Sequence, residues 1–435
     1  MTAASVGVLA LAIFLIFIIG GSTISLVMFA VGIFGYAFLT SSKAAFSMVA
    51  IDFFSSINSY NMSVIGMFSF MGYLAMYSGI GSRLYDAAYK FLGHSRGGLA
   101  VASEAACAAF GAVCGSGPAT TATIASIAYP EMKKHGYDAT LYTSCVAAGG
   151  GLGLLIPPSM GAIVYGIITG ASIGKLFIAG IGAGLLLMVL YMIVINIQVR
   201  MHPEYAPVSP RYTWKERFNS LGNGLWEVVI IFAFSIGGIT LGWFTPTEGG
   251  AMGAFAVLAL VLLMRQIDFK GIVSALLDTV KTVGMVLLLV AAATTFGRFI
   301  ALAQIPSACA NWIMGMETNR YVVLLIITLI YLMAGCFVDM LPMIMLTVPI
   351  FYPIIVDYAG FDAIWFGVFS VLVSCMGMIT PPVGVDVYVA KGVAPDVKLE
   401  TIFKGVWWYV GAIFVCIFLV TVFPQIILWL PNLLQ

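Results

Sequence analysis

Apolar residues fill long stretches of this chain, and short polar or glycine- and proline-rich segments separate them. Many stretches are long and apolar enough to cross the roughly 30 Å core of a bilayer as helices. These predicted spans are Ala3–Gly20, Ser22–Leu39, Met62–Tyr77, Ala139–Ile168, Leu176–Val199, Leu225–Leu241, Gly249–Met264, Val283–Leu302, Ala363–Ala390 and Gly405–Leu430. The pattern predicts an all-α, polytopic membrane protein.

Four segments are expected at the membrane surface, and three of them mix charged and apolar residues; the fourth, Ile305–Met316, contains no charged residue. They are Lys43–Tyr60, Arg83–Arg96, Arg265–Lys281 and Ile305–Met316. Such segments are typical of amphipathic helices that lie at a membrane surface. We therefore expect them to connect the spans at the interface.

The segment 97–132 is apolar but interrupted. Small residues dominate Gly97–Val113, the sequence CGSGP at Cys114–Pro118 breaks the helix, and a second apolar arm leads to the basic sequence EMKKH. A simple crossing would place the sequence HSR at 94–96 and EMKKH on opposite sides of the membrane, although basic connections favour the cytoplasm. The sequence therefore predicts a re-entrant hairpin with its tip at Cys114–Pro118.

The following span, 139–168, is also interrupted. Its centre reads GLGLLIPPS, and tandem prolines remove backbone donors and clash with the preceding turn. We therefore expect a broken transmembrane helix. Irregular backbone at membrane depth is tolerated where it is buried in protein or lines a cavity.

The hairpin and the broken helix occur twice. Gly111, Pro118, Thr123, Gly136, Asp138, Gly153, Pro157 and Pro158 are matched 224 positions later by Gly335, Pro342, Thr347, Gly360, Asp362, Gly377, Pro381 and Pro382. This constant spacing of 224 residues predicts a second hairpin at 321–355, with its tip at 337–342, and a second broken helix at 363–390. We divide the chain into a first repeat at 1–199, a linker at 200–223 and a second repeat at 224–435.

Each repeat contains an odd number of crossings besides its hairpin, so the second repeat should be inverted relative to the first. The charges agree with this topology: of the 19 basic residues, all except Lys43, Lys175, Arg298 and Arg320 would be cytoplasmic. The linker would be cytoplasmic and both termini periplasmic or external. Binding sites of such inverted-repeat proteins lie at the repeat interface.

Composition excludes several functional classes. The chain is 62% hydrophobic and 9% charged, and its net charge of +1 argues against a nucleic-acid partner. The three histidines lie in polar connections and no Cys-x-x-Cys pair occurs, so no intramembrane metal cluster is expected. Paired catalytic carboxylates are also absent. We expect a transporter, and keep an intramembrane enzyme or channel as a remote alternative.

Two sodium sites are predicted where the hairpin tips meet the broken helices. Carbonyl and hydroxyl oxygens without a ring of carboxylates suit a monovalent cation, since divalent ions require several acidic ligands. The predicted sodium ligands are Cys114, Ser116, Gly117, Gly151, Gly153 and Pro157 for the first site, and Cys336, Asp339, Gly377, Thr380 and Val383 for the second. The alternative is that these glycines and prolines only kink helices for packing.

An anionic substrate is expected beside these sites, because helix N-termini after the breaks, at Ser159 and Val383, direct positive dipole ends inward. The predicted substrate-binding residues are Ser116, Pro158, Ser159, Arg298 and Pro381. Arg298 is a basic residue inside a span, which is often functional. It could equally reach the membrane interface or form a salt bridge, and the same alternatives apply to Glu104, Asp339 and Asp386.

Several motifs carry a family resemblance. FGAVCGSGPATTATIASIAYPEMKKHGYD, GLGLLIPPSMGAIVYGIITGASIGKLFIAGI, GWFTPTEGGAMGA and MGMITPPVGVDVYVAKGVAP resemble the large membrane subunit of tripartite ATP-independent periplasmic (TRAP) transporters. The resemblance covers nearly the whole chain. The chain departs from the family pattern at Arg298, Ser374 and Asp386, where an aromatic residue, Asn and Asn are expected.

The resemblance implies a sodium-coupled elevator importer of an organic anion, a carboxylate or sulfonate, in the bacterial inner membrane. It also implies two partners, a small four-helix membrane subunit and a periplasmic substrate-binding protein, and no cofactor besides Na⁺ as coupling ion. The alternative within transporters is a sodium/dicarboxylate elevator carrier that needs no binding protein.

Overall fold

The computed structural model describes residues 2–207, 212–222, 224–308 and 319–433, and these ranges contain helices and connections but no β-strand. The first half holds α1 (Ala3–Ile19), α2 (Ile24–Leu39), α3 (Ser42–Ile57), α4 (Ser63–Tyr77), α5 (Ile80–Leu92), α6 (Gly98–Cys114), α7 (Gly117–Lys134), α8 (Ala139–Gly149), α9 (Leu152–Leu155), α10 (Met160–Thr169) and α11 (Ile173–Met201). Short 3₁₀ turns lie at Tyr60–Met62 and Pro203–Tyr205.

The second half follows a similar order. It holds α12 (Trp214–Leu221), α13 (Leu225–Phe232), α14 (Gly238–Thr240), α15 (Pro246–Leu263), α16 (Phe269–Leu302), α18 (Arg320–Gly335), α19 (Met340–Tyr352), α20 (Ala363–Ile379), α21 (Val385–Val393), α22 (Leu399–Val422) and α23 (Gln425–Leu433). π-Helical segments, Ala233–Gly237 and Pro353–Tyr358, follow α13 and α19.

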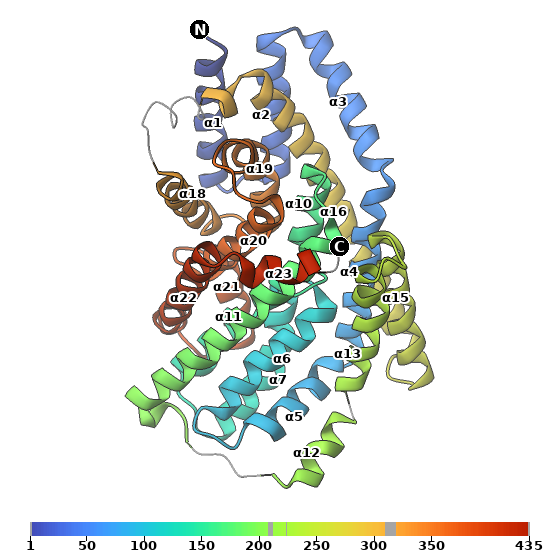
Figure 1. The fold of residues 1–435 in the computed structure, drawn as a ribbon, viewed down its shortest axis with the longest axis vertical. Helices are drawn as coiled ribbons and strands as arrows, with labels where there is room; N and C mark the ends of the chain where they lie inside the picture. The colour runs from blue at the N-terminus through green and yellow to red at the C-terminus, as the bar shows by residue number, and fades with distance from the viewer. Residues whose placement is uncertain (1, 208–211, 223, 309–318, 434–435) are drawn as a thin grey trace.

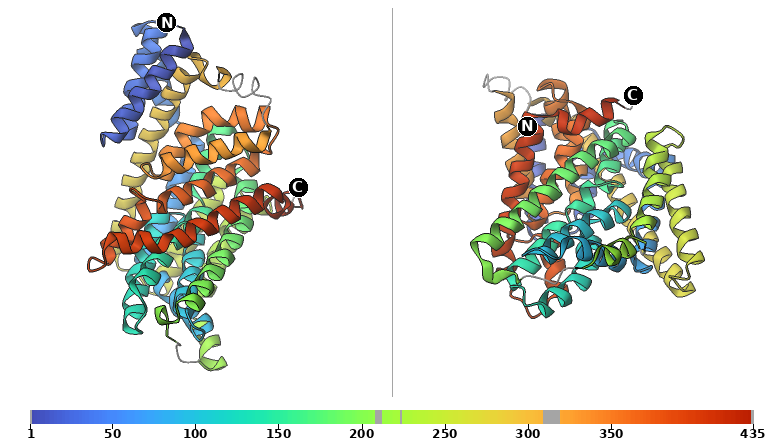
Figure 2. Two further views of the ribbon diagram at one scale, coloured as in Figure 1. Left: turned by 90° about the vertical axis from the view of Figure 1, so that its left-hand side faces the viewer. Right: turned by 60° about the horizontal axis from the view of Figure 1, so that its bottom comes forward.

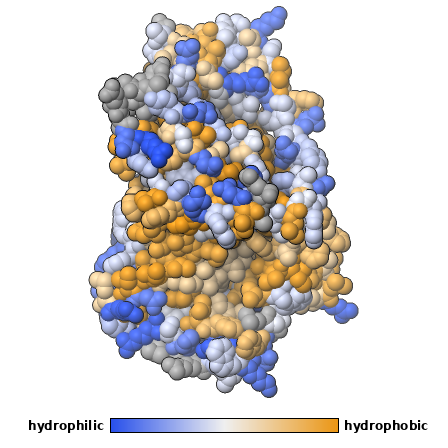
Figure 3. Space-filling view, viewed as in Figure 1, coloured by the Kyte–Doolittle hydropathy of each residue, from blue (hydrophilic) through white to orange (hydrophobic). Residues whose placement is uncertain are grey.

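The length and hydropathy of the helices are those of a membrane protein. Within the described ranges, 6 helices are long and apolar enough to cross a bilayer, or up to 8 if each of two bent helix pairs is one span. Shorter apolar helices add to these, among them α1, α2, α6, α18 and α20. Figure 3 shows apolar side chains gathered in a broad band across one face, between clusters of hydrophilic residues.

The ends of the molecule are built from different helices than its centre. In Figure 1, α1, α2 and α3 lie at one end and α5 and α12 at the other, with the broken helices between them. The left view of Figure 2 shows α22 beside α11, and the terminal helix α23 also packs on α11. The indole of Trp365, near the start of α20, is buried and donates to the carbonyl of Val420 of α22 at 2.8 Å.

Two helix boundaries differ from the prediction. Most of the expected surface segment Arg265–Lys281, from Phe269 onwards, forms one helix, α16, with the expected span Val283–Leu302, because no helix-breaking residue separates them. The expected last span, Gly405–Leu430, ends at Val422, since Pro424 cannot continue the helix. The predicted surface segment Ile305–Met316 lies largely outside the described residues.

Residues 224 positions apart adopt the same local structure. Gly136 and Gly360 are both left-handed, with φ of 73° and 72°. The side chains of Asp138 and Asp362 both accept from backbone amides at the start of the next helix. The peptide bonds Pro157–Pro158 and Pro381–Pro382 are both cis. The helix packing is also matched, because α2 packs on α16 and α15 on α4.

Candidate functional site

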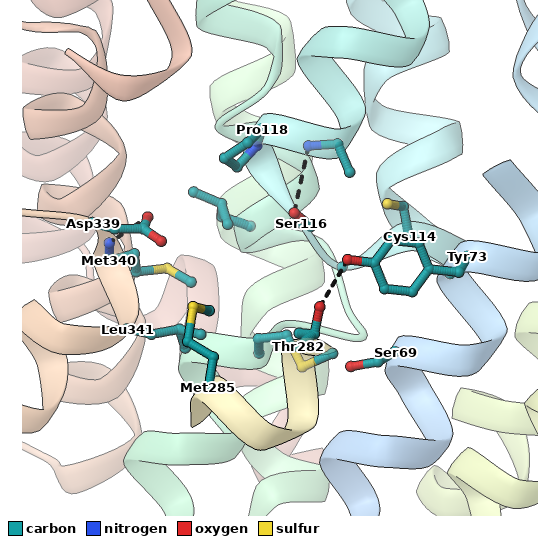
Figure 4. A pocket seen from close by; sticks show the side chains of 15 residues that line it. Ser69, Tyr73, Cys114, Ser116, Pro118, Thr282, Met285, Asp339, Met340 and Leu341 are labelled. Atoms are coloured by element: carbon teal, nitrogen blue, oxygen red, sulfur yellow. Dashed lines mark hydrogen bonds between the residues drawn. The ribbon is translucent and has the colours of Figure 1, made fainter. Parts of the chain in front are cut away.

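A cavity of about 170 Å³ lies where both hairpin tips face helices α4 and α16 (Figure 4). Ser69 and Tyr73 come from α4, and Thr282 and Met285 from α16. The Tyr73 and Thr282 hydroxyls are 2.8 Å apart, which joins these two helices across the cavity. Ser116 and Asp339 approach from the two hairpin tips. With residues from either side of the first helix break, the lining combines five separate parts of the chain.

The first hairpin turns sharply at its tip. Gly115 ends α6 with a φ of 68°, a conformation that glycine adopts without strain. The Ser116 hydroxyl then caps α7 by accepting from the Ala119 amide at 3.5 Å. A side chain on Gly115 would collide with the carbonyl oxygen of Pro158. The hairpin tip thus fits directly against the first break.

The first broken helix is interrupted between α9 and α10. Residues 156–159 form the connection, and the Ser159 hydroxyl caps α10 by accepting from the Ala162 amide at 3.2 Å. Pro157 and Pro158 are buried. The cavity lining includes Leu154 and Met160 but neither proline nor Ser159.

Oxygen atoms of the first hairpin meet the backbone of the broken helix at Gly153. A Cβ on Gly153 would stand 3.2 Å from the carbonyl oxygen of Ser116 and closer still to the hydroxyl oxygen of Thr120. Gly111 lies about one turn before the end of α6, and a Cβ on it would stand 2.5 Å from the Gly153 Cα. The structure therefore brings together the two segments that the sequence assigned to the first sodium site.

The second tip and the second break also meet. The Gly384 amide donates to the Cys336 carbonyl at 3.4 Å, and a Cβ on Gly335 would stand 2.9 Å from the Gly377 Cα. Asp339 caps α19 by accepting from the Met340 amide at 2.7 Å. The Thr380 hydroxyl is buried and donates to the Met376 carbonyl at 2.6 Å, so its lone pairs stay available.

The remaining residues assigned to these sites lie in the same two regions. Gly117 begins α7, and the carbonyl of Gly151 accepts from the Cys375 thiol at 3.4 Å. Pro381 and Val383 lie in the second break, between α20 and α21, and are half-buried. Cys114 lines the cavity at the end of α6.

Arg298 lies apart from the hairpin tips. It is on α16 and pairs with Asp52 of α3, at 2.8 Å between Nη2 and Oδ1, with Asp52 fully buried. Arg298 lines a second cavity, of about 450 Å³, together with Ser55, Ser56 and Ser59. The structure therefore does not place Arg298 beside Ser116, and it shows the salt bridge that the sequence left as an alternative.

Three side chains at the first hairpin were not among the predicted sodium ligands. Thr120 and Thr121 on α7 and Asp386 on α21 are fully buried, and their oxygens have no hydrogen-bond partner among the described residues. The threonines follow the tip by only one turn, in the sequence PATTAT. Two hydroxyls next to a helix break are therefore the sequence signal that could have identified them as ligands. Glu104 on α6 is also buried and without a hydrogen-bond partner there.

The comparisons with known proteins identify the family. The family model described as tripartite ATP-independent periplasmic transporter, DctM component, matches residues 11–426. The chain belongs to this family. It is 34% identical, over 88% of its length and 89% of the relative, to the C4-dicarboxylate TRAP transporter large permease DctM of Pseudomonas aeruginosa. It is 36% identical, over 81% and 82%, to the ectoine TRAP transporter large permease TeaC of Halomonas elongata.

Other TRAP permeases are similar over most of this chain. The sialic acid TRAP transporter permease SiaT of Haemophilus influenzae is 30% identical over 87% of this chain and 61% of that protein. The YdaH transporter of Alcanivorax borkumensis has a similar fold, with a TM-score of 0.60 at 13% identity over 88% of this chain and 90% of that one. The resemblance inferred from the motifs is thus confirmed, and the chain is a transporter permease and not an enzyme.

Proposed function

We propose that this TRAP permease is the large membrane subunit of a sodium-coupled importer of an organic anion, and that it works by an elevator mechanism. The observation that carries this proposal is the meeting of the Ser116 carbonyl and Thr120 hydroxyl with the glycine backbone of the first break. Oxygen atoms from a hairpin tip and from an interrupted helix form the type of site that coordinates Na⁺ in secondary transporters.

The first sodium ion would lie between the tip of the first hairpin and Gly151–Pro157. The Thr120 hydroxyl has no other hydrogen-bond partner among the described residues, so it is free to act as a ligand. The second sodium ion would lie between Cys336–Asp339 and Gly377–Val383. There the Asp339 carboxylate uses one oxygen for the Met340 amide, which leaves acceptor capacity for a cation.

The charge of the cavity supports coupling between Na⁺ and an anion. Among the described residues that line it, Asp339 carries the charge and none is basic. An anionic substrate next to an unneutralised carboxylate is disfavoured by several kcal/mol at low effective dielectric. Sodium binding at the second tip would remove this repulsion, so Na⁺ and the anion should bind together.

The paired structures favour two inverted repeats that move against each other. The hairpins α6–α7 and α18–α19 and the broken helices would form the moving domain. Helices α1–α4 and α13–α16 would form the scaffold, since α2 packs on α16 and α15 packs on α4. Rigid-body movement of one such group past the other would expose the site alternately to each side.

The substrate class rests on the relatives. Their names give a C4-dicarboxylate, ectoine, isethionate and sialic acid as transported molecules. We infer a small organic acid for this chain, delivered by a periplasmic binding protein, with a small four-helix membrane subunit extending the scaffold in the bacterial inner membrane. Both chain termini would then be periplasmic.

Transport into proteoliposomes tests this function. The chain would be reconstituted with the small subunit and binding protein of its own system, and radiolabelled succinate, ectoine, isethionate and sialic acid offered with Na⁺, K⁺ or choline outside. We expect uptake of one of these acids only with Na⁺ and the binding protein. Uptake that persists in choline would refute sodium coupling.

The second candidate is the sodium/dicarboxylate elevator carrier without a binding protein, the alternative that the sequence left open; DctM of Pseudomonas aeruginosa, a relative of this chain, is named for a C4-dicarboxylate. The same vesicles without binding protein and small subunit distinguish the two. Succinate uptake by the chain alone would favour this second candidate.

A further inference from the structure

A buried carboxylate from the second half of the chain enters the first hairpin. Asp386 lies on α21, directly after the second break, and none of its surface is exposed. Its Oδ2 stands 3.3 Å from the position of a Cβ on Gly117 and 3.2 Å from that of a Cβ on Gly150. Asp386 therefore reaches the place where α7 packs against the end of α8.

Three oxygens converge on the face of Gly150. The Thr121 hydroxyl, the Gly117 carbonyl and the Asp386 carboxylate all lie within 3.2 Å of the point where a Cβ on Gly150 would stand. Any side chain at this position would displace all three groups. The absence of a Cβ at Gly150 thus leaves an oxygen-lined cradle between α7, α8 and α21.

The Thr121 hydroxyl is held away from its usual partner. A buried threonine in a helix commonly donates to the carbonyl four residues earlier. Threonines of the described chain that donate to the carbonyl four residues earlier, at 2.6–3.0 Å, are Thr40, Thr143, Thr169, Thr279, Thr294, Thr295, Thr328, Thr347, Thr380 and Thr421. The Thr121 hydroxyl makes no hydrogen bond to any described residue, including the nearby Gly117 carbonyl. Its lone pairs are therefore open to a ligand.

The charge of this cradle is not balanced within the described residues. Both Asp386 oxygens lack a hydrogen-bond partner, and no salt bridge to Asp386 is found there. A buried ionised carboxylate is costly unless a cation or donors compensate it. One carboxylate, one hydroxyl and one carbonyl are hard oxygen ligands with a single negative charge, which matches a monovalent cation and not a divalent one.

We propose that Asp386, Thr121 and the carbonyl of Gly117, a residue that the sequence assigned to the first site, bind a further Na⁺ ion, separate from those at the two breaks. The proposal rests on sodium being the coupling ion. This ion neutralises Asp386 and so strengthens the packing of α21 against α7 and α8, which joins part of the second repeat to the first hairpin. Each transport cycle then carries one more positive charge than the two break sites provide.

Counting bound ions tests the proposal. The purified full-length chain in lipid nanodiscs would be titrated with ²²Na⁺ to saturation, and bound Na⁺ per chain compared between wild type, Asp386→Asn and Thr121→Val. We expect one Na⁺ fewer in each variant. Asp357→Asn, an exposed carboxylate, and Thr328→Val, a threonine that bonds to its own helix, are matched controls that should keep the full number.

Folding is checked in the same samples. Asp386→Asn removes a buried charge, so its melting temperature in Na⁺-free buffer should equal or exceed that of wild type, while its stabilisation by Na⁺ should be smaller. An unchanged number of bound ions in both variants would overturn the proposal and leave the proposed function standing. A variant that loses a titrating proton but binds as many Na⁺ ions as wild type would also overturn the proposal. If wild type binds no Na⁺, both this proposal and the proposed function are refuted.

Discussion

At the residue scale, Arg298 shows how a charge inside a predicted span can be structural. Its guanidinium pairs with the fully buried Asp52 and so compensates a carboxylate that the protein has already desolvated. Arg298 is itself 54% exposed, toward the cavity that also holds Ser55 and Ser56. The pair therefore fixes α3 to α16, whatever else the arginine contacts.

We expect Arg298→Ala to destabilise the protein by about 1–3 kcal/mol, because it leaves the buried Asp52 carboxylate without its partner. The measurement is the thermal midpoint of the purified chain. Lys43→Ala, an exposed basic residue on the same helix as Asp52, is the control and should have little effect. A midpoint equal to that of wild type would mean that the pair contributes no stability.

Some site residues were predictable from sequence and others were not. Ser116 and Asp339 lie beside glycines and prolines that break apolar helices, and these breaks are visible in any single sequence. Thr120 and Thr121 sit in a regular helical pattern, so their missing hydrogen bonds appear only in three dimensions. The approach of Asp386 to Gly117 joins residues from the two halves of the chain, and no local pattern predicts such a contact.

At the element scale, glycine pairs let the hairpins lie directly on the broken helices. Gly111 faces Gly153, and Gly335 faces Gly377, with backbone atoms where side chains would otherwise stand. Close backbone approach through small residues is a common way to pack helices in membranes. This packing holds the hairpin tips next to the breaks, where the proposed sodium ligands lie.

Gly111→Ala should therefore separate the first hairpin from its broken helix. The new Cβ would meet the Gly153 Cα at 2.5 Å, and backbone atoms must move to make room. We expect a loss of about 1–3 kcal/mol, typical of overpacking, together with weaker Na⁺ stabilisation. Gly392→Ala, at an open helical position of α21, should be neutral or slightly stabilising. Equal thermal midpoints for the two variants would contradict this account.

Helix boundaries show where sequence patterns fall short at this scale. The charged residues of Arg265–Lys281 suggested a separate surface helix, but α16 begins at Phe269 and continues through Lys270, Asp278 and Lys281 to Leu302, because charges alone do not end a helix. The equivalent segment of the first half is divided into α3 and α4, with Asn58 and Ser59 between α3 and the short turn that precedes α4. Turn-forming residues at the boundary, and not the charges along the segment, therefore end the helix in the first half.

At the scale of the whole molecule, a buried ion pair joins the two halves. Arg83 on α5 donates to Glu227 on α13 at 2.7 Å, and Glu227 is 1% exposed. The Gln266 amide also donates to Glu227, at 3.1 Å. These contacts hold α5, next to the first hairpin, against the start of the second half.

Arg83→Ala should lower stability by about 3 kcal/mol, the lower end of the range for breaking a buried ion pair, because Gln266 still donates to Glu227. Unfolding of the purified chain, followed by temperature, measures the change. Lys133→Ala removes the exposed pair with Asp396 and should change stability little. If both variants unfold at the same temperature, the Arg83–Glu227 pair does not join the halves.

The central claim is that the hairpin tips and helix breaks bind Na⁺. Its most direct test is the melting temperature of the purified chain in increasing Na⁺, with K⁺ and choline at equal ionic strength. Binding to the folded state raises stability by RT ln(1 + [Na⁺]/Kd), so we expect a Na⁺-specific rise that grows with concentration and shrinks in Thr120→Val. Equal stabilisation by Na⁺, K⁺ and choline would contradict the claim.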